Sequence, residues 1–187
     1  MNSVRIIEVD QENVVDKALA FAKDAHESVG QKRKYTNDPY IVHPMEVSKI
    51  VKSVGGSEAM QAAALLHDTV EDTNVTNVEI AEHFGPEIAK LVSELTDISK
   101  LEDGNRAFRK AMDRDHSASA SADAQTVKLA DLISNSKSIV KHDPNFARVY
   151  IKEKEALLQV LDKGNSRLHA IASKQVADAK ETLKIPR

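Results

Sequence analysis

The sequence predicts an all-α protein, a helical bundle of about eight to ten helices in a single domain that spans residues 1–187. Three observations lead to this fold class. Apolar residues recur at helical spacing along most of the chain, and the sustained alternation that is typical of strands is missing. Glycine and proline are sparse, with 6 and 5 residues, so no linker-like run marks a domain boundary.

The first predicted helix lies near the N-terminus. Its apolar stripe consists of Val14, Ala18, Leu19, Phe21 and Ala25. Two short apolar pieces flank it, IIEV near the start of the chain and YIV at positions 40–42, and both are too short to predict a sheet. A second helix is expected to begin near Pro44, directly after His43, and a further helix is expected to carry the stretch ALLHDTVEDT.

The next two helices have clear start signals. Thr76 and Glu79 have the spacing of a capping box, and Pro86 is well placed at a first helical position. The least regular segment is 99–123, whose serine- and alanine-rich part, SASASAD, is expected to be a loop. That segment is either a flexible connection or a gate near a binding site. Asp143 with Pro144, and then Asn165, predict the starts of the last two helices.

The composition excludes several classes of function. Hydrophobic residues make up 41% of the chain and charged residues 29%, as in an ordinary globular protein, and the formal net charge is −3. No overall basic field therefore favours long nucleic acid as a partner. The absence of cysteine excludes disulfides and zinc–thiolate sites, and fits the reducing cytoplasm. We find no apolar run that could span a membrane and no signal peptide, so a cytoplasmic location without membrane contact is expected.

The most informative stretch is HDTVED, in which His67, Asp68, Glu71 and Asp72 stand among apolar residues. On a helix, Glu71 would lie one turn beyond both His67 and Asp68. Burying an imidazole and three carboxylates is costly unless something compensates them, and a divalent metal would do so. The competing interpretation is a helix that ends here, with its acidic side chains in solvent.

Two further segments carry candidate groups. Lys32, Arg33 and Lys34 form a basic run ahead of His43, although such a run is commonly a solvated surface, and a lone histidine is commonly a packed or capping residue. In VKLADLISN, Asp131 and Asn135 lie one turn apart with Lys128 beside them. An aspartate among apolar residues needs a partner, which is either a metal or a structural ion pair with Lys128.

These segments together provide His43, His67, Asp68 and Asp131, a complete ligand set for one metal ion that leaves coordination positions for water and substrate. The sequence spacing does not show that the segments converge. An N/O ligand set does not by itself distinguish manganese from zinc or iron.

At this point the chain resembles a known family. QKRK, PYIVHP, ALLHDTVEDT and VKLADLISN, in this order, are similar to the hydrolase domain of RelA/SpoT-type alarmone enzymes, within the HD metal-dependent phosphohydrolases. The resemblance spans roughly residues 17–135, and the absence of a synthetase domain is typical of stand-alone small alarmone hydrolases. It implies Mn²⁺-dependent hydrolysis of (p)ppGpp to GDP or GTP and pyrophosphate, with one ion per chain and a small nucleotide as the only expected partner.

The resemblance also implies residue roles. His43, His67, Asp68 and Asp131 match the metal ligands, and the Glu71–Asp72 pair matches the residues that position and activate the attacking water. The matches to substrate-binding positions are Arg33, Lys34, Tyr40, Asn135 and, in a C-terminal helix, Arg148, with Lys128 in the KLAD motif. Arg106, Arg109 and Lys110 are added for their clustering in NRAFRK, where a solvated helix face is the alternative.

The chain also departs from the family pattern. The link AHESVGQ is longer than usual, YTND replaces the usual SGE before PYI, and KLADLISNS lacks the usual basic residue. These differences leave the choice of nucleotide open. Adenosine alarmones or another nucleotide 3′-phosphate are alternative substrates, and a non-catalytic alarmone sensor or a structural helical module are alternatives of a different class. The oligomeric state is not predicted.

Overall fold

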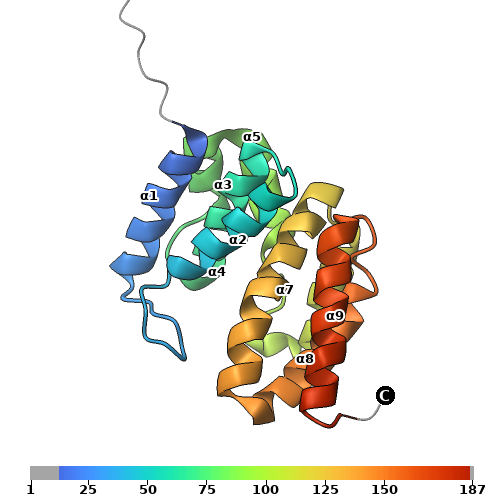
Figure 1. The fold of residues 1–187 in the computed structure, drawn as a ribbon. Coiled ribbons are helices and arrows are strands. Elements are labelled where there is room, and N and C mark those ends of the chain that lie inside the picture. Colours follow the sequence, from blue (N-terminus) through green and yellow to red (C-terminus); the bar gives the residue numbers. More distant parts are fainter. Residues whose placement is uncertain (1–12, 186–187) are drawn as a thin grey trace, which may run out of the picture.

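A computed structural model describes residues 13–185 of the chain (Figure 1). Within that range the fold is all-α, as predicted, with nine α-helices and one short 3₁₀ helix. The helices are α1 (Val14–Ser28), α2 (Val42–Ser53), α3 (Glu58–Leu66), α4 (Thr69–Asp72), α5 (Asn77–Leu95), η1 (Leu101–Asp103), α6 (Arg106–Ser119), α7 (Ala122–His142), α8 (Pro144–Leu158) and α9 (Ser166–Thr182). The IIEV segment lies outside the described residues, and the prediction of one domain over residues 1–187 stays a prediction.

The predicted helix starts are confirmed by their caps. Thr76 and Glu79 form a capping box at the start of α5, where the Thr76 N–H donates to Glu79 Oε2 at 2.8 Å. The side chains of Asp143 and Asn165 accept backbone N–H groups at the starts of α8 and α9. Pro86 begins a new helical stretch, because Gly85 has a φ of 83° and breaks α5 just before it.

Two local predictions are wrong. The HDTVED stretch is not one continuous helix: α3 ends at Leu66, and His67 and Asp68 form a turn before the short α4. The Thr69 hydroxyl donates to the Leu66 carbonyl at 2.7 Å, so a side chain takes the place of a helical backbone partner there. The SASASAD stretch is not a loop either, because α6 continues to Ser119 and α7 begins at Ala122.

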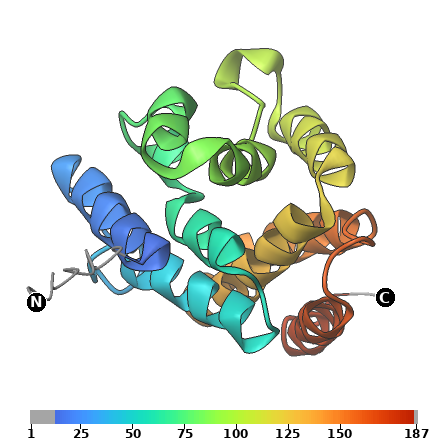
Figure 2. The ribbon, with the colours of Figure 1, turned by 90° about the horizontal axis from the view of Figure 1, so that it is seen from above.

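Two helices, α3 and α7, lie at the centre of the molecule. α3 packs against α1, α2, α5 and α7, and its residues Ala62, Ala63 and Ala64 are fully buried. Small side chains let neighbouring helices approach closely. α7 packs against α2, α5, α8 and α9, so the α2–α7 contact joins the N-terminal and C-terminal helices. Seen from above, α1 and α9 lie on opposite sides of the molecule (Figure 2).

Candidate metal centre and substrate cleft

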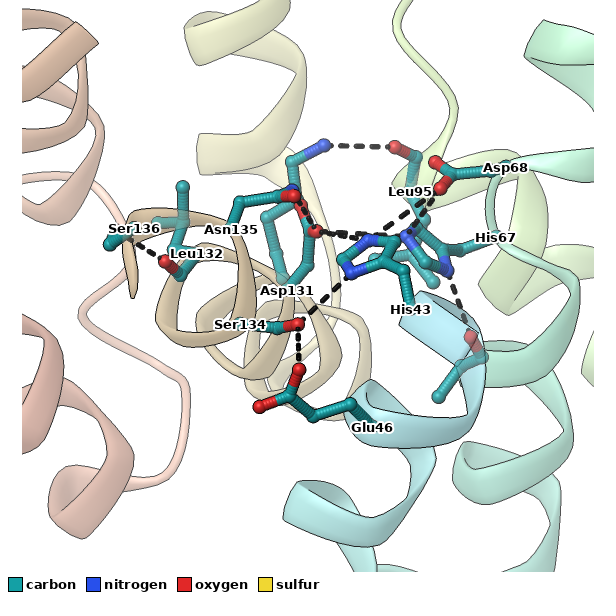
Figure 3. Close-up of polar contacts among 12 residues, drawn as sticks. His43, Glu46, His67, Asp68, Leu95, Asp131, Leu132, Ser134, Asn135 and Ser136 are labelled. Carbon is teal, nitrogen blue, oxygen red and sulfur yellow. Dashed lines mark hydrogen bonds and ion pairs between the residues drawn. The ribbon is translucent and has the colours of Figure 1, made fainter. Parts of the chain in front are cut away.

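The structure brings together the four predicted ligands from three separate segments. His43 comes from the first turn of α2, His67 and Asp68 from the α3–α4 turn, and Asp131 from the middle of α7 (Figure 3). His43 Nε2 lies 3.1 Å from Asp131 Oδ1, and His67 Nε2 lies 3.2 Å from Asp68 Oδ2. His43, His67 and Asp68 each offer a ligand atom, and these atoms lie within 4.8 Å of one another.

The orientation of His67 suits a metal ligand. Its Nδ1 donates to the Ala64 carbonyl at 2.8 Å, which leaves Nε2 to face the cluster. That Nε2 is buried and makes no hydrogen bond within the described part of the protein. A buried polar atom without a partner is costly, and a divalent cation bound by imidazole and carboxylate groups would satisfy it. The residues present therefore fit a metal ion.

The charges of the cluster also favour a bound cation. Burial opposes protonation of His67, but the carboxylates of Asp68 and Asp131 outweigh it and raise the pKa of His67 to about 9. Burial also opposes ionisation of Asp131, yet the imidazoles of His43 and His67, at 3.1 and 3.7 Å from its Oδ1, hold its pKa well below the usual value. The two carboxylates thus favour a positive charge between the imidazoles, which either protons or a metal cation can supply.

Polar neighbours hold both aspartates. The Tyr40 hydroxyl donates to Asp68 Oδ2 at 2.6 Å, and the Asn135 amide donates to Asp131 Oδ1 at 2.7 Å. Burial and the nearby Asp68 charge raise the pKa of Tyr40, so it remains a donor. Lys128 does not pair with Asp131, and the structural ion pair considered above is absent among the described residues. Lys128 Nζ instead lies 3.6 Å from Asp97 Oδ1.

Glu71 and Asp72 lie on α4, beyond the metal ligands. Glu71 Oε1 accepts the Asp97 N–H at 2.6 Å, and Glu71 borders the cleft described below. The surrounding protein atoms and the Asp97 charge raise the pKa of Glu71 to about 7, although Lys128 opposes this. Asp72 Oδ2 accepts the Gln31 amide at 2.8 Å. A carboxyl group with a pKa in the range of that of Glu71 is suited to exchange protons near neutral pH.

A cleft extends from the cluster in two directions. Its central part has a volume of about 330 Å³ and is bordered by Asp68, Glu71 and Asp131 on one side and by α6 and α8 on the other. One arm, about 300 Å³, is lined by Arg33, Lys34, Tyr35, Tyr40 and Phe146, among others. The other arm, also about 300 Å³, is lined by Asp72, Ser99, Arg106, Arg109 and Lys110, among others. Each arm shares wall residues with the centre.

The basic residues of the two arms differ in how firmly they are paired. Arg33 Nη2 donates to Asn135 Oδ1 at 3.3 Å, whereas Lys34 Nζ lies 3.7 Å from Asp143. Arg106 forms a two-pronged ion pair with Glu153 at 2.7 and 2.8 Å, and Lys110 lies 2.6 Å from Asp97. The Nε atom of Arg109 is buried without a hydrogen-bond partner among the described residues.

One predicted residue lies apart from the cleft. Arg148 is exposed on α8 and lines none of the three connected parts of the cleft. Its role in binding phosphate stays a prediction. A larger hollow of about 720 Å³ lies between α8 and α9 and contains none of the predicted site residues.

Sequence reasoning missed several residues of the cleft wall. Asp97 holds Glu71 and Lys128, and Phe146 and Tyr150 supply aromatic surface. Lys154 is 1% exposed, and burial lowers its pKa to about 8. Lys154 Nζ donates to the Leu132 carbonyl and to Gln175 Oε1. No family motif surrounds these positions in the sequence, and the only cue that it offers is a lysine inside an apolar helical stripe.

Comparison with known proteins decides the family. A family model described as HD domain matches residues 18–155. The chain belongs to the HD domain family. Guanosine-3′,5′-bis(diphosphate) 3′-pyrophosphohydrolase MESH1 of Xenopus tropicalis is 40% identical over 131 residues, which cover 68% of this chain and 70% of that protein. The resemblance to alarmone hydrolases that the motifs indicated is confirmed.

Two further similarities define the extent of the match. The GTP pyrophosphokinase rsh of Brucella ovis is 39% identical over 131 residues, but the matched part is 68% of this chain and only 17% of that protein. The chain therefore spans less than a fifth of such longer relatives. A solved structure of a metazoan ortholog of SpoT that hydrolyses ppGpp aligns with a TM-score of 0.78 and 26% identity, over 88% of this chain and 94% of that one.

Proposed function

We propose that this chain is a metal-dependent 3′-pyrophosphohydrolase of guanosine alarmones, which converts (p)ppGpp and water to GDP or GTP and pyrophosphate. The observation that carries the proposal is the cluster of the buried His43, His67 and Asp131 with the half-buried Asp68, at the wall of a cleft lined by basic residues. Membership of the HD domain family and the similarity to MESH1 support the same activity.

We propose Mn²⁺ as the cofactor, with one ion per chain held by those four residues. The unpartnered Nε2 of His67 and the imidazole and carboxylate donors support a divalent cation. Such an ion would polarise the phosphoryl oxygens and lower the pKa of water, which is the chemistry that a diphosphate ester requires. The cytoplasmic location expected from the sequence is part of this proposal.

Glu71 is the group proposed to take the proton from the attacking water. The backbone N–H of Asp97 holds Oε1, and no hydrogen bond to Oε2 is found among the described residues. Its pKa of about 7 suits a general base. The water oxygen bonds to phosphorus while the bond from phosphorus to the ribose 3′ oxygen breaks, and that oxygen takes up a proton. Asp72, held by Gln31, is proposed to help orient the water.

The two arms of the cleft are proposed to bind the two phosphorylated ends of the nucleotide. Arg33 and Lys34 line one arm, and Arg106, Arg109 and Lys110 line the other. Guanidinium groups bind phosphate oxygens in pairs, and ammonium groups offset their charge. Among the described residues, the buried Nε of Arg109 has no hydrogen-bond partner, whereas Arg106 and Lys110 are paired with acidic side chains. Lys128 borders the central part of the cleft, near the metal cluster.

The nucleoside is proposed to lie against Tyr40 and Asn135, where the first arm meets the central part of the cleft. The Arg33 guanidinium lies over the Tyr40 ring, 5.7 Å from its centre, so a cation and an aromatic face meet there. Stacking surfaces accept either purine. A surface of this kind does not select between the two bases, so adenosine alarmones are proposed as a second group of substrates.

One panel of assays tests the proposal. Purified protein supplied with Mn²⁺ is incubated with ppGpp, pppGpp, pppApp and NADPH, and both pyrophosphate and the nucleotide product are measured. Hydrolysis of the guanosine alarmones with release of pyrophosphate is expected. Binding of ppGpp without turnover would indicate an alarmone sensor, and protein that binds neither metal nor ppGpp would indicate a structural module.

A further inference from the structure

A chain of hydrogen bonds runs from His43 away from the metal cluster. His43 Nδ1 lies 3.0 Å from Ser134 Oγ, and Ser134 Oγ donates to Glu46 Oε2 at 2.8 Å (Figure 3). The other carboxylate oxygen of Glu46 accepts from Lys137 Nζ at 3.0 Å. His43 is thus linked through a buried hydroxyl to a carboxylate that is itself anchored by a lysine.

The direction of these hydrogen bonds is fixed by the groups involved. An ionised carboxylate only accepts, so the single hydroxyl proton of Ser134 must go to Glu46. Ser134 can then offer only a lone pair to the imidazole, which requires the proton of His43 to be on Nδ1. With Nδ1 protonated in a neutral ring, Nε2 has a free lone pair. Nε2 is the atom that lies 3.1 Å from Asp131 and 3.7 Å from Asp68.

The same two helix faces build the cluster and the hydrogen-bonded chain. His43 and Glu46 lie one turn apart on α2, and Asp131 and Ser134 lie one turn apart on α7. His43 is 2% exposed and Ser134 is 3% exposed, so water does not compete for the hydrogen bond between them. The α2–α7 packing therefore sets the position of the metal ligands and of their supporting groups together.

We infer that Ser134 and Glu46 are positioning residues for the metal centre: they hold the His43 ring in place and keep its Nε2 free to bind the ion. This inference rests on the metal site of the proposed function. Outer partners of a metal-binding histidine fix its tautomer and raise its basicity, and their loss typically weakens metal affinity about 10- to 100-fold. Neither Ser134 nor Glu46 is among the residues that line the cleft.

A merely structural role predicts a different result. If Ser134 and Glu46 only join α2 to α7, their removal lowers the melting temperature and leaves metal affinity unchanged in the folded protein. If they position His43, metal affinity falls while the folded protein remains intact. The measurement is therefore the dissociation constant of Mn²⁺ for the full chain by isothermal titration calorimetry, with the helical circular dichroism and melting temperature of each variant.

Three single variants make the comparison. Ser134→Ala removes the link and is expected to weaken Mn²⁺ binding about 10- to 100-fold. Glu46→Gln keeps the size and an acceptor oxygen but removes the charge, and a smaller loss in the same direction is expected. Glu155→Gln is the matched control. Like Glu46, Glu155 is a partly exposed glutamate paired with a lysine, Lys180 at 2.9 Å, but it lies on α8, away from His43 and Ser134. It is expected to bind Mn²⁺ like the unaltered protein.

The double variant, which carries Ser134→Ala and Glu46→Gln, tests whether Glu46 acts on His43 through Ser134. Since Glu46 acts through Ser134, the double variant is expected to bind Mn²⁺ no more weakly than Ser134→Ala alone. At saturating Mn²⁺ the turnover of both single variants is expected to approach that of the unaltered protein, because the reacting groups are intact.

Metal affinity that is unchanged in folded Ser134→Ala and Glu46→Gln proteins would overturn the inference while leaving the proposed function in place. Strictly additive losses in the double variant would overturn the pathway through Ser134. If Ser134→Ala does not fold, the half-exposed Glu46→Gln still decides the question. Failure of the unaltered protein to bind Mn²⁺ would instead overturn the proposed metal centre, and with it this inference.

Discussion

The Gln31 side chain donates a 2.8 Å hydrogen bond to Asp72 Oδ2, across 41 residues of sequence. A second hydrogen bond fixes the orientation of the Gln31 amide, because its Oε1 lies 2.6 Å from Nδ1 of the buried His26. Burial lowers the pKa of His26 despite that hydrogen bond, so the ring is neutral and donates from Nδ1. α1 and the loop after it thereby fix the second carboxylate of the Glu71–Asp72 pair.

We expect Gln31→Ala to lower turnover about tenfold with little effect on metal binding. A hydrogen bond to a charged group contributes about 1.5–3 kcal/mol, and 1.36 kcal/mol corresponds to a tenfold change in rate. Steady-state kinetics and Mn²⁺ titration measure the two quantities. Gln31→Glu adds a sharper comparison, because it places a carboxyl group opposite Asp72. Its turnover relative to the unaltered protein is expected to increase as the pH falls and the new group is protonated. A ratio that does not change with pH would contradict this role of Gln31.

Asp68→Ala is expected to abolish Mn²⁺ binding and activity while leaving the helices largely intact. Asp68 Oδ2 lies near both histidines, at 3.2 Å from His67 and 3.7 Å from His43. Metal content of the purified protein, turnover and circular dichroism are the measurements. Asp178→Ala, which changes an exposed aspartate of α9, serves as the control. An active Asp68→Ala protein without metal would contradict the ligand assignment.

Glu71→Gln is expected to lower turnover about 100-fold or more, the usual scale for removal of a general base, at unchanged Mn²⁺ affinity. The side chain keeps its size and loses the ability to take a proton. If the Glu71→Gln protein instead loses Mn²⁺ affinity, Glu71 is a metal ligand and the proposed role as a base is wrong.

The pKa of Glu71 provides an independent test of its position. In metal-free protein the carboxyl carbon of Glu71 is expected to titrate at about pH 7 by NMR. Because a nearby positive charge favours the carboxylate, added Mg²⁺ as a diamagnetic divalent ion is expected to move the midpoint to lower pH. A midpoint that saturating Mg²⁺ does not move would place the ion away from Glu71.

Arg109→Ala is expected to raise KM for ppGpp several-fold, with little change in the melting temperature. Arg109 lines the second arm of the cleft and its Nε has no partner among the described residues, so the guanidinium is expected to bind phosphate in place of a protein acceptor. Arg167→Ala, at an exposed position of α9, is the control. An unchanged KM would instead support the alternative interpretation, in which the basic residues of NRAFRK form a solvated helix face.

Guanosine and adenosine alarmones are expected to be hydrolysed with kcat/KM values within about tenfold, which is a discrimination of about 1.4 kcal/mol. The first arm of the cleft offers Arg33, Tyr35, Tyr40 and Phe146 as planar surfaces, and these accept either base. Parallel kinetics with pppGpp and pppApp provide the measurement. A thousandfold preference would reveal a hydrogen bond to the base edge, since unpaired polar groups reject the wrong ligand strongly.

Local signals in the sequence determined the helices and their boundaries. The capping box of Thr76 and Glu79, the Asp143–Pro144 start and the Asn165 cap depend on contacts within one helical turn, so they can be predicted without the fold. The residue types of the four candidate ligands were likewise evident. The break between α3 and α4 was not, because the spacing of HDTVED is equally compatible with one helix and with a helix followed by a turn.

The tertiary structure alone decided which side chains meet. Asp131 reaches His43 because α7 packs on α2, and Lys128 pairs with Asp97 instead of Asp131 because α5 ends beside it. The links from Ser134 to Glu46 and from Gln31 to Asp72 join residues 88 and 41 positions apart. Such contacts depend on how whole helices pack, and helical periodicity determines which face of a helix is buried but not which other helix covers it.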